Sequence, residues 1–140
     1  MATSDDPTEA RADVELRLPA DGAFASVLRT TTAGLAARLD FTIDDIEDLR
    51  IAIAEASALV LAEADPGADL VSRFFLSPGR MQVQIETQAI DDPAPDYDSF
   101  AWQVLDTLAT DAEASSAGGV FRVRFSMSSQ VAPTEAGAGL

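Results

Sequence analysis

The chain has 140 residues, and 47% of them are hydrophobic, which is enough for one domain with its own core. Its 24 acidic residues outnumber nine basic ones, all of them arginine, and the formal net charge is -15. Nucleic-acid binding requires a basic surface that displaces counterions from phosphates, so this charge excludes it. The lack of cysteine and histidine excludes disulfides, cysteine-ligated zinc and histidine acid–base chemistry.

The two ends of the chain predict tails rather than targeting segments. Residues 1–12 are rich in Asp, Glu, Pro, Thr and Ala, and residues 130–140 are small and polar, so we expect both to be flexible. The N-terminal stretch lacks the apolar core of an export signal, and no apolar run approaches the ~18 residues of a membrane span. We therefore expect one folded domain over residues 13–129, located in the cytoplasm and away from membranes.

The first predicted elements are a strand and a long helix. Val14, Leu16 and Leu18 alternate with charged residues up to Pro19, which is the period-two pattern of a half-buried strand. Asp21 is placed to cap the following helix, which extends as far as Asp40. The apolar residues that recur at helical spacing in this segment are Phe24, Val27, Leu28, Leu35 and Leu39.

A second helix is predicted from Thr42 to the Pro66-Gly67 stop. Thr42 followed by Asp45 resembles a capping box, and the acids of the first turns suit the positive end of the helix dipole. The apolar face comprises Ile43, Ile46, Leu49, Ile53, Ala56 and Val60.

The second half of the sequence predicts three strands and one helix. Residues 68–88 read as a hairpin around the turn Ser77-Pro78-Gly79-Arg80, residues 99–114 as a helix, and residues 120–127 as a final strand. The complete order predicts an α/β two-layer sandwich. We expect a mixed, largely antiparallel sheet of four to five strands, covered on one face by about three helices.

The span from Arg29 to Ala56, RTTTAGLAARLDFTIDDIEDLRIAIAEA, resembles RsbW-type anti-sigma factors. These are small members of the histidine-kinase-like (GHKL, Bergerat-fold) ATPase superfamily. The resemblance implies partner switching: the protein sequesters a sigma factor and is displaced from it by an anti-anti-sigma protein of the STAS type. Many family members phosphorylate a serine of that antagonist with ATP. The resemblance also implies a homodimer formed through the first strand and first helix.

The stretch EASALVLAE, residues 55–63, corresponds to the family's nucleotide-binding helix. There a glutamate is followed four residues later by an asparagine that holds Mg²⁺, and residues four apart share one face of a helix. Glu55 matches the glutamate and is the one retained catalytic candidate, with a solvated helix residue as the alternative. Leu59 stands in place of the asparagine and offers no oxygen to the metal. We therefore predict no metal site.

Two further nucleotide-binding motifs of the family are missing. Asp91 and Asp92 are weak candidates for the adenine contact, but the glycine of the family's Asp-x-Gly pattern does not follow them. The glycine-rich lid is also missing, since no glycine occurs between Gly79 and Gly118, and phosphate cradles need residues without Cβ. We expect no cofactor, with Mg-ATP as the alternative.

A domain without nucleotide chemistry must act through its surface. Arg29 matches a basic residue that the family presents to its partners, and the single Tyr and Trp lie where an ATP lid would be. Each candidate also has a structural alternative: a solubilising arginine, acids that cap a helix, or a core tryptophan. The candidate partner-binding residues are Arg29, Asp44, Asp45, Glu47, Asp48, Tyr97 and Trp102.

The resemblance and the missing motifs together favour an anti-sigma factor without ATP-dependent catalysis. Two alternatives remain. One is an active serine-protein kinase that phosphorylates its antagonist. The other is a sensor that binds a small ligand in the vacated nucleotide pocket, for which we expect an apolar cavity under the segment Ala89 to Phe100.

Overall fold

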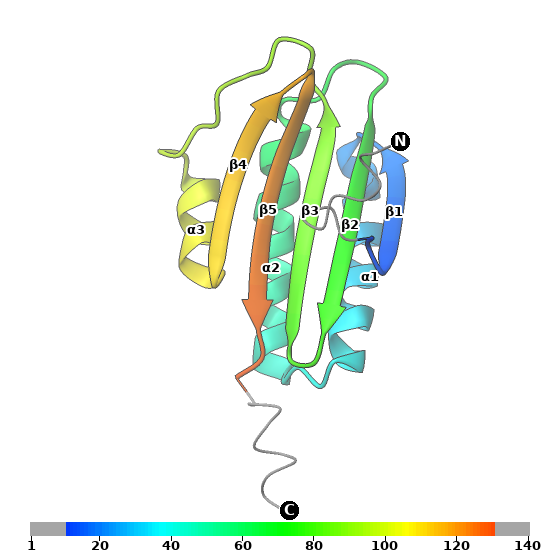
Figure 1. Ribbon diagram of the computed structural model, residues 1–140, viewed down its shortest axis with the longest axis vertical. Coiled ribbons are helices and arrows are strands. Elements are labelled where there is room, and N and C mark those ends of the chain that lie inside the picture. Colours follow the sequence, from blue (N-terminus) through cyan, green and yellow to red (C-terminus); the bar gives the residue numbers. More distant parts are fainter. Residues whose placement is uncertain (1–10, 131–140) are drawn as a thin grey trace, which may run out of the picture.

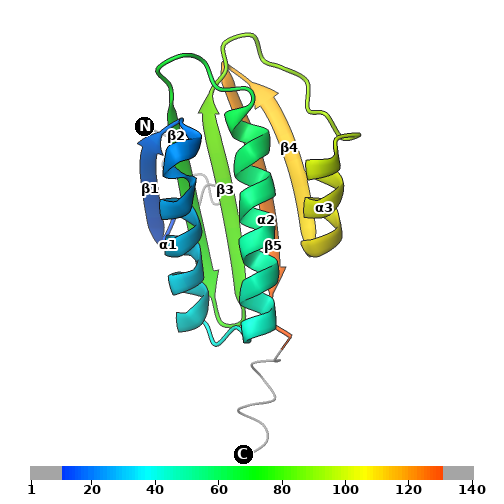
Figure 2. The same ribbon diagram turned by 180° about the vertical axis from the view of Figure 1, so that it is seen from behind.

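The computed structural model describes residues 11–130, which form two layers (Figures 1 and 2). One layer is a five-stranded sheet with the order β1-β2-β3-β5-β4, and the helices cover one of its faces. This confirms the predicted two-layer sandwich. The expectation of a mixed sheet is wrong, because all four strand pairings are antiparallel. The predicted tails lie outside the described residues, except for Arg11, Ala12 and Gln130.

The elements follow one another with short connections in most places. The helices are η2 (a 3-10 helix, Gly22–Phe24), α1 (Ala25–Arg38), α2 (Ile43–Leu61) and α3 (Phe100–Leu108). The strands are β1 (Val14–Pro19), β2 (Asp69–Ser77), β3 (Arg80–Gln88), β4 (Asp111–Ala117) and β5 (Val120–Ser128).

Helix α2 is the centre of the helical layer and lies between α1 and α3 (Figure 2). The predicted capping box is present: Asp45 N donates to Thr42 Oγ1, and Thr42 N donates to the Asp45 carboxylate. Most of the predicted apolar face is buried against the sheet, but Ile43 is exposed because it occupies the first helical position on the outer side. No helix within residues 11–130 combines the length and apolarity that crossing a membrane requires.

Helix α1 begins later than the sequence indicated. Asp21 caps the short helix η2, where its carboxylate accepts a hydrogen bond from Ala23 N, and α1 follows from Ala25. The buried line of α1 consists of Leu28, Thr32 and Ala36, four residues apart. Phe24 and Val27, expected on the inner face, are exposed.

The predicted β2–β3 hairpin is confirmed. Ser77 pairs with Arg80 across the turn, where Gly79 has a φ of 69° that glycine adopts without cost. The inner faces of the central strands supply the largest part of the core under the helices. Their buried apolar residues are Leu70, Phe74, Met81, Val83, Ile85, Phe121, Val123, Phe125 and Met127.

The segment after α3 corrects the sequence prediction. The helix expected over residues 99–114 ends at Leu108, and Asp111–Ala117 forms the edge strand β4, paired with β5. The residues of β4 that face inward are Ala112, Ala114 and Ser116. Because they are small, the sequence of β4 lacks the alternation of large apolar and polar residues that predicts a strand. The hairpin turn Gly118-Gly119 has positive φ at both residues, as a tight turn between two strands requires.

Candidate functional site

Glu55 and Leu59 lie one turn apart in α2. Both are partly exposed, and Leu59 also packs against the hydrophobic core. Helix α3 packs alongside α2 (Figure 2). The structure therefore gives Leu59 a packing function at the position where the family has a metal ligand.

The side chains on this part of α2 offer fewer oxygen atoms than the family's nucleotide-binding motif does. Mg²⁺ is held in proteins by one or two side-chain oxygens, with water and phosphate oxygens completing its octahedron. Of the two family positions, only Glu55, the catalytic candidate, has a side-chain oxygen, and Leu59, at the position of the family's Mg²⁺ ligand, has none. Within residues 11–130 there is no group of three or more acidic side chains placed to hold a metal ion.

The segment between β3 and α3, residues 89–99, has few amide groups to offer a phosphate. Pro93 and Pro95 have no N–H. Five other amides already donate within the protein: those of Ala89, Ile90, Asp92, Asp98 and Ser99. Phosphate cradles depend on several converging free amides. The segment also has four aspartates, at positions 91, 92, 96 and 98, which repel a polyanion. Most of the amides in this segment are therefore not free to bind a phosphate.

Asp92, a candidate for the adenine contact, forms a hydrogen bond within the protein. Its backbone φ is 49°, a left-handed conformation that aspartate tolerates, and its Oδ1 accepts a hydrogen bond of 2.8 Å from Gly119 N. Ala89 N donates to Gly119 O, so the segment is fastened to the β4–β5 turn at two points. Asp91 is exposed beside it.

Tyr97 and Trp102 form one unit that positions α3. Their rings meet edge to face, with centroids 4.9 Å apart. The Tyr97 hydroxyl donates to the Ala114 carbonyl oxygen on β4 at 3.1 Å. Trp102 is partly buried against the core, whereas half of Tyr97 is exposed. The structural alternative thus accounts for Trp102, and Tyr97 keeps one accessible side.

The acidic cluster at the start of α2 divides into two kinds of residue. Asp45 is buried and its carboxylate accepts hydrogen bonds from Thr42 N, Ser129 Oγ and Gln130 N. Burial would raise the pKa of Asp45, but these donors outweigh it and hold the pKa below its usual value. Asp44, Glu47 and Asp48 face solvent to varying degrees. Asp45 therefore stabilises the fold, and the other three form the accessible part of the cluster.

Arg29 lies on α1, half-buried, and makes no ion pair with any residue between 11 and 130. The same holds for Arg38 and Arg50 of the helical layer. These arginines differ in this respect from those on the sheet.

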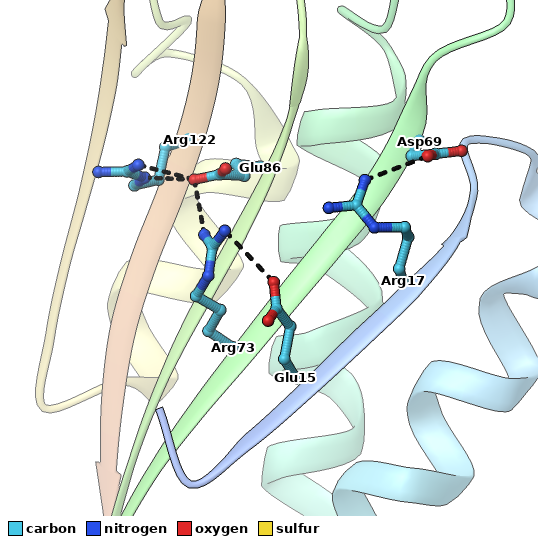
Figure 3. Close-up of polar contacts among 6 residues, drawn as sticks. All are labelled: Glu15, Arg17, Asp69, Arg73, Glu86 and Arg122. Atoms are coloured by element: carbon cyan, nitrogen blue, oxygen red, sulfur yellow. Dashed lines mark hydrogen bonds and ion pairs between the residues drawn. The ribbon is translucent and has the colours of Figure 1, made fainter. Parts of the chain in front are cut away.

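The outer face of the sheet carries an ion-pair network that sequence reasoning did not find (Figure 3). Arg73 on β2 reaches Glu15 on β1 at 3.4 Å and Glu86 on β3 at 3.1 Å, while Arg122 on β5 reaches Glu86 at 2.7 Å. Partial burial would raise the pKa of Glu86, but the two arginines hold it below its usual value. Part of the signal was available, because charged residues alternate with apolar ones in β1 and in the first half of β5.

Five arginines in all pair with five acids on this face. The remaining pairs are Arg17–Asp69, Arg80–Asp111, Arg124–Asp111 and Arg124–Glu113. The outer sheet face is consequently close to neutral in an otherwise acidic protein.

An apolar groove lies between α2 and α3, with a volume of about 390 Å³, and it is open to solvent. The residues that line it are Ile51, Phe100, Gln103, Val104, Thr107 and Leu108. Of the segment from Ala89 to Phe100, under which a sensor cavity was expected, only Phe100 takes part. Sequence reasoning missed the groove because it depends on where α3 packs.

Known proteins similar to this chain point to one family. Over 76 residues the chain is 41% identical to the serine-protein kinase RsbW of Halalkalibacterium halodurans, covering 54% of this chain and 47% of that protein. Over 78 residues it is 37% identical to the serine-protein kinase RsbW of Bacillus velezensis, covering 54% and 49%. Over about half of its length, the chain is similar to RsbW. The predicted resemblance to RsbW-type proteins is thereby confirmed.

The similarity to RsbW covers only part of each chain. The chain spans about half the length of the RsbW proteins it matches. No protein-family model matches it. A solved structure of the RsbU and RsbW domains of Rv1364c from Mycobacterium tuberculosis superimposes with a TM-score of 0.64 over 83% of this chain and 32% of that chain, at 15% identity. This likeness shows that the fold is shared.

Proposed function

We propose that the chain is an RsbW-type anti-sigma factor that sequesters a sigma factor and releases it to an anti-anti-sigma protein, without transferring phosphate. The observation that carries the proposal is Leu59, a hydrocarbon side chain one turn after Glu55 in α2. A regulator of this kind works through competing protein contacts, which need no nucleotide.

The segment before α3 supports the same proposal. Five of its amides donate hydrogen bonds within the fold, and its four aspartates would repel a polyanion. Restoring Leu59 to asparagine would supply one metal ligand but no phosphate cradle. The loss of nucleotide chemistry is thus spread over several parts of the chain.

The partner surface in this proposal centres on Arg29, a half-buried arginine without an ion pair to any residue from 11 to 130. A guanidinium free of internal partners can form a bidentate contact with a carboxylate of the sigma factor or of its antagonist. Strand β1 lies at one edge of the sheet, and α1 is at the same side of the helical layer. Together they are the surface for the proposed homodimer.

The test combines nucleotide titration with partner binding. By isothermal titration calorimetry we expect no heat of binding for Mg-ATP with the wild type or with Leu59→Asn. The sigma factor that co-purifies from the native host is expected to bind Arg29→Glu about tenfold more weakly, since a charged contact is lost. Arg38→Glu, on the same helix, is the matched control. Micromolar binding of Mg-ATP, or equal affinities of the two arginine variants, would overturn the proposal.

A second candidate is the active serine-protein kinase, which is favoured by the name of the relatives. In that case labelled phosphate passes from ATP to a serine of the antagonist, and Glu55→Gln abolishes the transfer. Under the leading proposal neither the wild type nor Glu55→Gln transfers label.

A further inference from the structure

We propose that the groove between α2 and α3 is a docking site for a basic amphipathic helix of a partner protein. The site uses different residues from the Arg29 contact on α1, so it does not depend on the proposed anti-sigma function.

The groove presents a continuous apolar strip to solvent. Phe100, Val104 and Leu108 are spaced four residues apart and share one face of α3, and Ile51 stands opposite on α2. Phe100 is 76% exposed and Ile51 45% exposed. Large apolar side chains that gather on one surface and remain in water mark interaction sites.

Acidic side chains flank this strip on α2. Glu47 and Asp48 precede Ile51 by four and three residues, and Glu55 follows it by four, so all three surround Ile51 on the same helix face. Arg50 is adjacent to Ile51 in sequence and points about 100° away around the helix. On α3, Asp106 lies three residues from the groove residue Gln103.

The flanking charge selects the occupant. Nucleic acid and anionic membranes are repelled by these carboxylates. A second copy of the chain would bring the same acids, and like charges facing each other cost affinity. A helix with apolar residues on one face and Arg or Lys beside them satisfies both features of the groove at once.

The dimensions also suit a helix better than a small ligand. Helix α3 has nine residues, about 13 Å, which matches two to three turns of a partner helix lying beside it. The groove is open along one side rather than enclosed, whereas small-molecule sites bury most of the ligand surface.

The test uses the full chain and a labelled synthetic peptide of about 14 residues, ~21 Å as a helix, with Leu at helical spacing and Arg elsewhere. A second peptide has the same composition in an order without an apolar face. Fluorescence anisotropy gives both affinities, and Trp102 fluorescence reports binding near α3. We expect the amphipathic peptide to bind at least about tenfold more tightly than the reordered one.

Variants of exposed residues locate the contact. Ile51→Ser and Phe100→Ser together are expected to weaken peptide binding about tenfold or more, because two large apolar contacts are lost. Ile43→Ser is the matched control, since Ile43 is 79% exposed on the same helix and outside the groove. Glu47→Gln should weaken binding and reduce its salt dependence, whereas Asp91→Asn in the segment before α3 should change neither.

Two results would overturn the inference. One is equal affinity for the two peptides, which would mean that charge alone attracts them. The other is equal affinity of the groove double variant and the Ile43→Ser control. Thermal unfolding of each variant verifies that the fold is intact, and the exposure of all these side chains makes that outcome expected.

Discussion

A single carboxylate, that of Asp45, joins the start of α2 to the end of the sheet. It closes the capping box with Thr42 N at 3.1 Å and accepts from Gln130 N at 3.0 Å, just beyond β5. The N-terminus of α2 and the segment that follows β5 thus both depend on one side chain, which is 4% exposed. Its sequence context suggested either capping or partner binding, and burial supports capping.

Replacing Asp45 by alanine is expected to lower the free energy of unfolding by about 2 kcal/mol, because a helix cap is lost and buried N–H groups lose their acceptor. Urea unfolding measures the change. Asp44→Ala, an exposed neighbour, is the control and should change it by less than about 0.5 kcal/mol.

The effect of Asp45 should depend on pH. Its pKa is lower in the folded than in the unfolded state, so the ionised form stabilises the fold above the ordinary aspartate pKa of about 3.9. This contribution is lost as the pH falls through the folded-state value. The stability difference between wild type and Asp45→Asn should therefore shrink in acid, and a constant difference between about pH 7 and about pH 3 would contradict it.

At the scale of single residues, the sequence was informative where the chemistry depends on residue type. Leu59 and the missing glycines could be recognised without coordinates. The groove around Ile51 could not, because its opposite wall comes from α3, more than 45 positions away. The unpaired state of Arg29 within residues 11–130 likewise depends on which strands bring carboxylates to the other arginines.

At the scale of elements, α3 and β4 form one unit held by Tyr97. Ser99 caps α3 by accepting from Trp102 N, Trp102 meets the Tyr97 ring, and the Tyr97 hydroxyl reaches the backbone of β4. The sheet edge at β4 is thereby partly covered, which reduces its tendency to pair with other chains.

Tyr97→Phe keeps the aromatic contact and removes only the hydrogen bond to Ala114. We expect a loss of about 1 kcal/mol in stability and faster amide hydrogen exchange in α3 and β4. Exchange in the β2–β3 hairpin is the internal control. A variant whose exchange rises equally in all strands would indicate global destabilisation instead of local loosening.

The elements that the sequence failed to predict share one cause. Strand β4 reads DAEASSA, with alanine and serine inward, so its period-two pattern has no apolar contrast, and its Ala and Glu favour helix. It forms a strand because β5 offers a complete partner edge across a tight glycine turn. Tertiary pairing therefore overrides local propensity here, whereas α2 was predictable from its own cap and apolar face.

At the scale of the whole molecule, charge is distributed unevenly between the two layers. Five of the nine arginines are paired on the outer sheet face, and the acids of α2 and of residues 89–99 have no comparable set of cations beside them. The helical side therefore carries most of the self-repulsion within residues 11–130.

Raising the salt concentration is expected to stabilise the protein, because screening weakens this repulsion more than it weakens exposed ion pairs. Between about 0.05 M and about 0.5 M NaCl at neutral pH we expect the melting temperature to rise by a few degrees, measured by calorimetry. A fall in melting temperature would mean that the sheet network contributes more than the repulsion costs. Glu86→Gln helps to separate the two effects, since it removes the acid that pairs with both Arg73 and Arg122 and changes the net charge by only one unit.

The neutral sheet face and the negative helical side give the molecule a large electric moment along the axis that joins its two layers. Electrostatic forces between proteins act within about one Debye length, roughly 8 Å at physiological ionic strength. Within that distance of a cationic macromolecule, this protein would rotate to turn its negative side toward the partner. The helices would then arrive first and the flat sheet would point away. Productive orientation would be set before contact, so association should be fast and sensitive to ionic strength even where the final contact area is small.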